Sequence, residues 1–294
     1  MKTLEALQRD MDVTADLQEI VRTMKVLAAV SIRQYERAQE SLLDYHRTVE
    51  LGLQAVLKQQ ANAAAKKKLT TKQKTGIVIY GTDHGLCGRY NESITEFALD
   101  ELDKINPNQD SRRILVIGSR VEATLSASGQ TVEDCFFVPG TVDNITGTIQ
   151  KILLKIEDWQ QHGIEHILLF HHARQQGFSY SPMIQQLFPV DLSDYNRSHT
   201  KPWPSRSVPQ FSLSAELLLS SLVRQHLFIK LFSACTESLA GEHSTRLMSM
   251  QVAEKNIQQR QESLTAIYRQ QRQEQITEEL LDVVSGFEAM KEQQ

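Results

Sequence analysis

Glycine and proline are scarce at both ends of this 294-residue chain. All seven prolines lie between Pro107 and Pro209, residues 1–51 contain neither residue type, and only two glycines follow Phe211. Because these residue types interrupt helices, their absence permits very long ones. The distribution excludes an even mixture of short elements. It predicts a helix, a mixed middle and a second helix.

The chain also lacks paired cysteines, a basic excess and a long apolar run. Its three cysteines, Cys87, Cys135 and Cys235, form no CxxC pair, which is typical of free thiols in a reducing compartment. A net charge of -4 argues against a dedicated nucleic-acid binder. The first residues carry acids where a signal peptide needs an apolar core, and charged residues interrupt the most apolar later stretch. We expect a cytoplasmic protein that reaches a membrane only through partners.

Apolar residues near the N-terminus follow heptad spacing, which predicts a coiled-coil helix. They are Leu4, Leu7, Met11, Leu17, Ile20, Met24 and Leu27. The stripe then slips toward Tyr35 and Leu42, a stutter that predicts local unwinding. As helices, residues 3–57 and 211–290 would be about 80 Å and about 120 Å long.

A middle domain about 30–40 Å across cannot cover helices of that length. We therefore expect the two helices to pair and the longer one to project into another protein. A homodimeric coiled coil is the alternative. However, Gln261, Gln271 and Gln275 stand where a tight dimer seam would need apolar residues.

The middle alternates apolar runs with helical stretches, which predicts a doubly wound, mostly parallel sheet. Strands are expected at 75–81, 112–118, 132–139 and 165–173, with helices at 91–105, 120–128 and 143–162. The predicted domains are an N-terminal helix (1–65), a central α/β domain (66–195), a proline-rich linker (196–210) and a C-terminal helix (211–294).

The loop in GIVIYGTDHGLCGRYN (76–91) has the spacing GxxxGxxG. It lacks the lysine and hydroxyl of a P-loop and does not match GxGxxG, so we expect no bound nucleotide. Asp83, His84 and Cys87 lie close together but are only weak evidence for a metal site, because no second cluster with a paired spacing accompanies them. His171 and His172 end a predicted strand and should point to opposite faces. The sequence predicts no catalytic residues and no cofactor.

Four stretches resemble the gamma subunit of F-type ATP synthases, over essentially the whole chain. They are EIVRTMKVLAAVSIR (19–33), GTDHGLCGRYN (81–91), SLAGEHSTRLMSMQVAEKN (238–256) and RQEQITEELLDVVSGFEAM (272–290). The last two are the most specific, because order, spacing and helical context all agree.

The resemblance implies a rotor shaft. The terminal helices would form an antiparallel coiled coil inside a ring of three alpha and three beta subunits. The middle domain would lie against the epsilon subunit and the membrane ring of c subunits. Such a subunit is non-catalytic and couples ion flow through the c-ring to conformational changes at the beta nucleotide sites, during ATP synthesis or hydrolysis. Its place would be the cytoplasmic face of a bacterial-type membrane, as a peripheral part of the complex.

The resemblance also implies roles for individual residues. The expected beta-subunit contacts are Arg22, Met24, Lys25, Arg272 and Gln273. An apolar bearing is expected at Val283, Val284, Phe287 and Met290. The loop at the base of the ring would contain Gly81, Gly85, Cys87 and Gly88.

The chain departs from the family pattern at several positions. Glu19 and Ser31 replace lysines, Arg269 replaces an asparagine, and Glu274 and Phe287 replace alanines. These changes weaken a cationic shaft and suggest a divergent gamma subunit from an alternate operon. A homodimeric coiled-coil scaffold and a nucleotide-binding α/β enzyme remain the alternative functions.

Overall fold

The computed structural model describes residues 3–59, 74–175, 179–190 and 210–291. The helices are α1 (Leu4–Ser41), α2 (Leu43–Gln59), α3 (Tyr90–Ile105), η1 (Gln109–Ser111), α4 (Ser119–Ala127), α5 (Val142–Gln161) and α7 (Ala215–Lys291). The strands are β1 (Thr75–Tyr80), β2 (Arg112–Ile117), β3 (Asp134–Phe136), β4 (His166–Arg174) and β5 (Tyr180–Phe188). Long helices at both ends and a mixed middle confirm the predicted layout.

The chain divides into two compact units. The helical unit combines residues 1–28 with 247–294, and the sheet unit comprises residues 29–246. Helices α1 and α7 contribute residues to both units. The domain boundaries expected at residues 65 and 195, and most of the expected linker 196–210, lie outside the described residues.

The sheet unit contains a five-stranded sheet in the order β3-β2-β1-β4-β5. Strands β1 to β4 are mutually parallel, and β5 pairs antiparallel with β4. The crossover helices place β2 on one side of β1 and β4 on the other, as in a doubly wound fold. The predicted doubly wound, mostly parallel sheet is therefore confirmed.

Strand β5 was not expected from the sequence. Its residues YSPMIQQLF include a proline and two glutamines, and the strand is only partly buried. Proline is tolerated in a strand that pairs along one side, because the missing N–H is not needed there. Pro182 lies opposite His172 of β4, so this edge position accommodates it.

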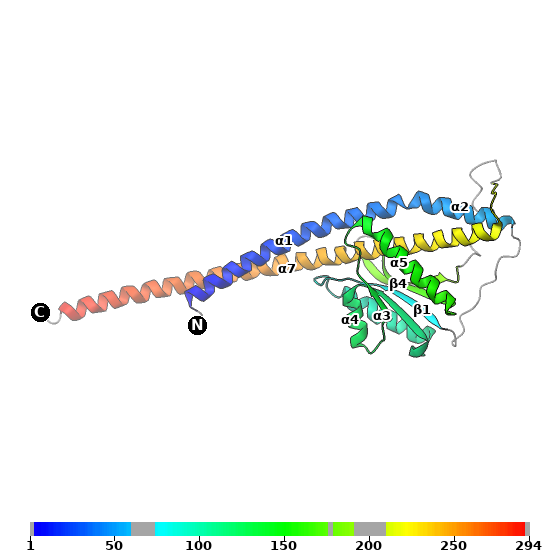
Figure 1. Ribbon diagram of the computed structural model, residues 1–294. Helices are drawn as coiled ribbons and strands as arrows, with labels where there is room; N and C mark the ends of the chain where they lie inside the picture. The colour runs from blue at the N-terminus through cyan, green and yellow to red at the C-terminus, as the bar shows by residue number, and fades with distance from the viewer. Residues whose placement is uncertain (1–2, 60–73, 176–178, 191–209, 292–294) are drawn as a thin grey trace. The chain divides into compact units, whose positions relative to one another are not determined.

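Each face of the sheet is covered by helices (Figure 1). On one face α3 and α4 pack onto the side chains of Ile77, Ile79 and Phe170. On the other face lie α5 and the paired segments of α1 and α7, against Val78 and Leu169. The long helices are therefore part of the core of the sheet unit.

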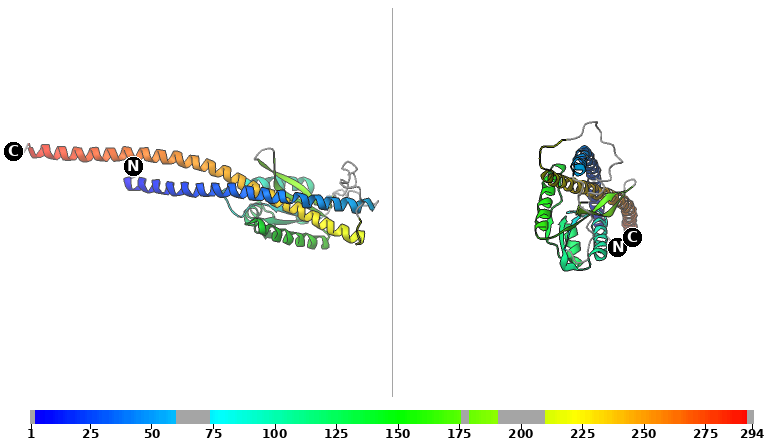
Figure 2. Two further views of the ribbon diagram at one scale, coloured as in Figure 1. Left: turned by 90° about the horizontal axis from the view of Figure 1, so that it is seen from above. Right: turned by 90° about the vertical axis from the view of Figure 1, so that its right-hand side faces the viewer.

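Within the sheet unit, α2 runs beside the start of α7 (Figures 1 and 2). Val49 and Leu53 of α2 cluster with Ile229 of α7, and all three are buried. Gly52 permits this approach, since an added Cβ would lie 2.9 Å from a methyl carbon of Leu222. A turn at Leu42 separates α2 from α1, where one helix was expected.

The helical unit is an antiparallel pair formed by the start of α1 and the end of α7. The buried residues of its α1 segment lie seven apart: Leu7, Thr14, Val21 and Ala28. In α7, the buried or half-buried residues from Met250 to Gln271 recur every three or four residues, with adjacent pairs at 253–254 and 264–265. A repeat of 3.5 residues per turn is the signature of a left-handed coiled coil.

The seam expected from the sequence was partly wrong. Leu17, Ile20 and Leu27 were expected at the seam but are 48%, 55% and 61% exposed. The predicted slip is also absent from the buried positions of α1, which continue at the same spacing to Tyr35.

In the described part of the chain, no helix is long and apolar enough to cross a membrane.

Candidate functional site

The glycine-rich loop follows β1 and leads into α3. Gly81 is packed so closely against α4 that an added Cβ would lie 2.1 Å from Val121 Cγ2. Gly88 has a φ of 59°, a conformation that favours glycine. The carbonyl of Gly85 accepts a hydrogen bond from Arg246 Nη2 of α7 at 3.3 Å. These glycines therefore serve close packing and a tight turn.

Polar side chains inside the loop bond to one another. The Asn91 amide accepts from the Thr82 N–H at 3.1 Å and donates to Thr82 Oγ1 at 2.9 Å. Cys87 is buried beside them, and burial raises the pKa of its thiol, which keeps it protonated and unreactive at neutral pH. The hydrogen bonds between side chains inside the loop therefore hold its backbone in place.

Asp83 joins the loop to two neighbouring segments. Its Oδ1 accepts from the N–H of Ser119, at the start of α4, at 2.9 Å. Its Oδ2 accepts from the N–H of Val138, just after β3, at 2.8 Å. The carboxylate thus satisfies one backbone donor at a helix N-terminus and a second one that follows a strand. Among the residues described, no group of histidines, cysteines and carboxylates could hold a metal ion.

The carboxyl ends of β1 and β4 form the switch point of the sheet, where doubly wound folds usually bind ligands. Here side chains fill that position. The ring of Tyr90 stacks on His172 of β4 with centroids 3.8 Å apart. The Tyr90 hydroxyl donates to the carbonyl of Ser238 in α7 at 2.6 Å. Burial lowers the pKa of His172 to about 3, so this histidine is neutral.

Charged side chains of α7 also lie beside the loop that follows β1. Arg246 Nη2 pairs with Glu242 Oε1 at 2.5 Å, and both side chains are buried. Burial raises the pKa of Glu242, while Arg246 beside it acts in the opposite direction. His171 and His172 point to opposite faces, as predicted, since His171 faces Glu237 of α7 and His172 contacts Ser93 of α3.

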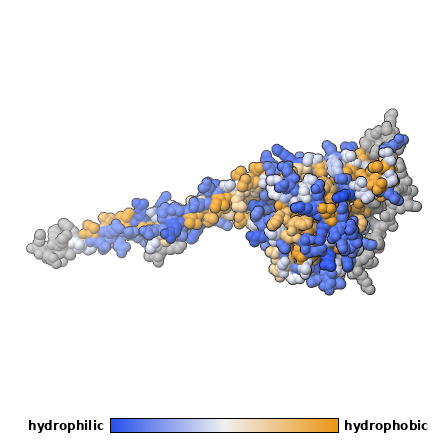
Figure 3. Space-filling view, viewed as in Figure 1, coloured by the Kyte–Doolittle hydropathy of each residue, from blue (hydrophilic) through white to orange (hydrophobic). Residues whose placement is uncertain are grey.

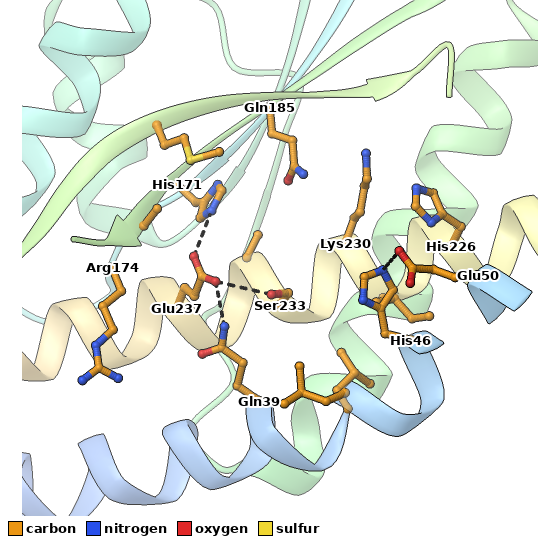
Figure 4. Close-up of a pocket in the computed structure, with 16 residues that line it drawn as sticks. Gln39, His46, Glu50, His171, Arg174, Gln185, His226, Lys230, Ser233 and Glu237 are labelled. Carbon is orange, nitrogen blue, oxygen red and sulfur yellow. Dashed lines mark hydrogen bonds and ion pairs between the residues drawn. The ribbon is translucent and has the colours of Figure 1, made fainter. Parts of the chain in front are cut away.

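The sequence did not indicate the cavity of about 500 Å³ in the sheet unit, shown in Figure 4. Its walls come from α1, α2, α7 and the last two strands, so its residues are scattered from Gln39 to Glu237. Glu237 accepts from Gln39 Nε2 at 2.7 Å and lies 3.5 Å from His171 Nε2. No local motif could have revealed such a constellation.

In the helical unit, two of the predicted contact residues share one partner. Arg22 Nε lies 3.3 Å from Glu254 Oε1 of α7, and Lys25 Nζ lies 2.5 Å from its Oε2. The hydrogen bond from Lys25 lowers the pKa of Glu254, with a further contribution from Arg22. Met24, which lies between them in the sequence, is half-buried. The positive charges are thus partly compensated within the chain.

The remaining predicted contact residues stay apart from this cluster. Arg272 and Gln273 are exposed, as is every α7 residue from Arg272 to Gly286. Val283 and Val284 of the expected bearing are 71% and 52% exposed. The side chains of Phe287 and Met290 lie outside the described residues. Apolar residues at a helix end that the described residues leave uncovered are typical of a binding segment.

Comparisons with known proteins agree over nearly the whole chain. A family model described as ATP synthase matches residues 3–290. The chain is 24% identical to the ATP synthase gamma chain of a Nitratiruptor species, covering 99% of this chain and 100% of that protein. It is 25% identical to the ATP synthase gamma chain of Campylobacter concisus, with the same coverage.

Solved structures share the fold. A chain of the Euglena gracilis mitochondrial ATP synthase (OSCP/F1/c-ring) superposes with a TM-score of 0.64 at 14% identity, covering 98% of this chain and 94% of that one. A chain of the Tetrahymena thermophila mitochondrial ATP synthase central stalk and c-ring gives 0.58 at 19% identity, covering 80% and 99%.

Proposed function

The chain belongs to the ATP synthase family, and from this premise we propose that it is the gamma subunit, the central-stalk rotor of an F-type ATP synthase. The observation that carries the proposal is the family match over residues 3–290, which includes both terminal helices and the sheet. The resemblance read from the sequence motifs is confirmed by this match and by the relatives named gamma chain.

In this proposal the chain transmits torque rather than performing chemistry. Helix α7 runs unbroken for 77 residues and contributes to both compact units. A helix whose backbone hydrogen bonds are all internal carries a twist from one end to the other. The seam with α1 stiffens it in the helical unit, and the packing of α7 on the sheet anchors it in the sheet unit.

The partners follow from the same premise. The helical unit lies within a ring of three alpha and three beta subunits, and the sheet unit contacts the epsilon subunit and the c-ring. Arg22, Met24, Lys25, Arg272 and Gln273 are proposed as beta-subunit contacts. The exposed end of α7 turns in an apolar sleeve, where no ion pair must be broken during rotation. The loop at Gly81, Gly85, Cys87 and Gly88 faces the base of the ring.

Rotation changes the affinities of the beta sites because the shaft presents different surfaces to the three beta subunits. Coupling of this kind needs a shared element that biases each site differently. The complex is attached to the cytoplasmic face of a bacterial-type membrane, and this chain is a peripheral part of it.

The test combines the purified chain with the alpha and beta subunits of the same organism. We expect one copy of the chain per six-subunit ring by native mass, and ATP hydrolysis that depends on its presence. A chain that remains a homodimer and leaves hydrolysis unchanged would favour the scaffold alternative. Nucleotide binding by the chain alone would favour the enzyme alternative.

A further inference from the structure

The cavity of the sheet unit shown in Figure 4 combines apolar walls with polar side chains that converge from helices and strands. Its volume of about 500 Å³ is within the range of small-molecule sites. Exposed hydrophobic side chains alone would not single out a site, because Figure 3 shows hydrophobic and hydrophilic residues interspersed over the face that it draws. A cavity with convergent polar groups does single one out. The apolar walls come from Leu42, Leu43, Ala173, Met183, Ile229 and Ala234.

Nitrogen donors of α7 and β5 meet in this cavity. Lys230 of α7 is half-buried and extends toward the strands, while Gln185 extends from β5 toward α7 (Figure 4). His226, one turn before Lys230, is buried, and burial, Lys230 and His46 together lower its pKa to about 4. At neutral pH this histidine is therefore uncharged, with one N–H that can donate. An ammonium, an amide and an imidazole are donors that suit a carboxylate.

The carboxylates that line the cavity already have partners within the chain. Glu237 accepts from Gln39 Nε2 at 2.7 Å, and its other oxygen lies 3.5 Å from His171 Nε2. Glu50 Oε1 lies 3.7 Å from His46 Nε2. These carboxylates offer little to a cationic ligand, so the cavity favours an anionic one.

We propose that this cavity binds a small monocarboxylate with a short hydrocarbon chain. The carboxylate accepts hydrogen bonds from Lys230, Gln185 and His226. A half-buried ammonium attracts an anion more strongly than an exposed one, because the local dielectric constant is lower. The hydrocarbon chain covers Leu43 and Met183, which are 62% and 41% exposed, and this burial of apolar surface favours binding. The site belongs to the chain by itself and goes beyond its proposed role as a rotor.

The first test titrates the full chain with hexanoate and follows the methyl groups of ¹³C-labelled methionines by NMR. We expect saturable binding and a shift of the Met183 signal, because this side chain lines the cavity. Met248, which is 49% exposed in the helical unit, should not shift. Hexylamine and hexanol have the same hydrocarbon chain without the carboxylate and should shift Met183 much less. An absence of saturable binding, or equal binding of hexylamine, would overturn the inference.

The second test removes the charge that holds the carboxylate. Lys230→Met keeps the apolar stem of the side chain and should weaken hexanoate binding by about tenfold or more, since a charge-assisted hydrogen bond is lost. The matched control is Lys151→Met, at an exposed lysine of α5, which should leave the affinity unchanged. Calorimetry measures both affinities, and far-ultraviolet circular dichroism checks that both variants are folded. Equal affinities in the two variants would contradict the assignment of Lys230.

The third test concerns the hydrocarbon chain. Leu43→Ser should weaken hexanoate binding severalfold, because apolar surface that the ligand covers is lost. Leu154→Ser is the control, since Leu154 is 60% exposed on α5 and does not line the cavity. If both variants bind hexanoate equally tightly, the proposed position of the hydrocarbon chain is wrong.

All three tests use the full chain without other subunits. A failure to bind hexanoate therefore leaves the proposed function standing. Conversely, a chain that binds hexanoate but does not assemble with alpha and beta subunits would refute the proposed function and leave this inference in place.

Discussion

Tyr90 joins three elements at the carboxyl end of the sheet. Its ring stacks on His172 of β4, and its hydroxyl bonds to the carbonyl and hydroxyl of Ser238 in α7, at 2.6 and 2.9 Å. Burial raises its pKa well above the ordinary value, so the hydroxyl remains a donor. One side chain therefore fixes α7 over the position where other doubly wound folds hold a ligand.

Removing this hydroxyl should loosen the attachment of α7 to the sheet. We expect Tyr90→Phe to lower the free energy of unfolding by about 1–2 kcal/mol, because a buried hydrogen bond is lost and Ser238 is left without that donor. Denaturant unfolding of the full chain measures this change in the free energy of unfolding. Tyr45→Phe is the control, since it removes an exposed hydroxyl bonded to Gln225 and should change stability much less. Equal losses in both variants would contradict this role.

The sequence indicates the glycine-rich loop but not the residues that the loop contacts. The spacing GxxxGxxG argued against a phosphate site, and Gly81 and Gly88 do have backbone roles. Ser238, however, lies 148 residues from Tyr90 in the chain. Arg246 likewise reaches the loop from α7. No local pattern encodes contacts between residues so far apart.

At the scale of elements, the choice of seam in α1 was the hardest to predict. The helix has two apolar faces, and pattern reasoning selected residues of the more hydrophobic one, including Leu17 and Ile20. The structure buries the face with Thr14 and Ala28 against α7. This buried face of α1 combines Thr14 and Ala28 with Leu7 and Val21, so a seam within one chain can include small and polar residues. The more hydrophobic face, with Leu17 and Ile20, stays exposed in the described residues, and the apolar pattern alone does not indicate this.

The inner strands of the sheet were easier to predict than its edge strand β5. Three of the four parallel strands are apolar runs buried on both faces, which makes them conspicuous in sequence. Strand β5 contains Pro182, Gln185 and Gln186 and is only partly buried, so its sequence does not stand out.

The ion pairs of the helical unit give a prediction for the α1–α7 pair. Lys25 and Arg22 keep the pKa of Glu254 below the ordinary carboxyl value. A lowered folded-state pKa adds stability above the unfolded pKa, and this is lost as pH falls through the folded value. We expect Glu254→Gln to lower the melting temperature at pH 7, with the difference vanishing in strong acid.

Thermal melts followed by circular dichroism at several pH values measure this difference. Glu278→Gln removes an exposed carboxylate further along α7 and serves as the control, with no change expected at any pH. A melting difference for Glu254→Gln that persists unchanged into strong acid would mean that the charge pairing is not its cause.

For the whole molecule, buried histidines predict how stability depends on pH. Burial lowers the pKa of His172 to about 3 and those of His226 and His243 to about 4. Lys230 and His46 face His226 and act in the same direction, as Arg246 does on His243. All three histidines ordinarily titrate near 6.5.

Below pH 6.5 the unfolded chain therefore takes up protons that the folded chain does not. The contribution of these three histidines to the free energy of unfolding is fully present above pH 6.5. It falls as pH drops toward about 4, by roughly 1 kcal/mol per pH unit for each histidine. Denaturant midpoints between pH 7 and pH 5 measure the slope. His172→Gln should reduce the slope, whereas His162→Gln, at an exposed histidine, should leave it unchanged. A slope that is the same in both variants would contradict the assignment.

The last prediction separates folding from function along α7. Every residue from Arg272 to Gly286 is exposed, so the isolated chain gains little from this segment, whereas Leu264 is buried in the seam. A chain ending at Gln275 should keep its melting temperature within about 1 °C. A chain ending at Glu262 should melt lower because it loses Leu264. In the assembled complex, however, both truncations should reduce ATP hydrolysis, since both remove the apolar residues Val283 and Val284. If the chain ending at Gln275 melted as low as the shorter one, the exposed segment would belong to the fold rather than to the interface with the ring.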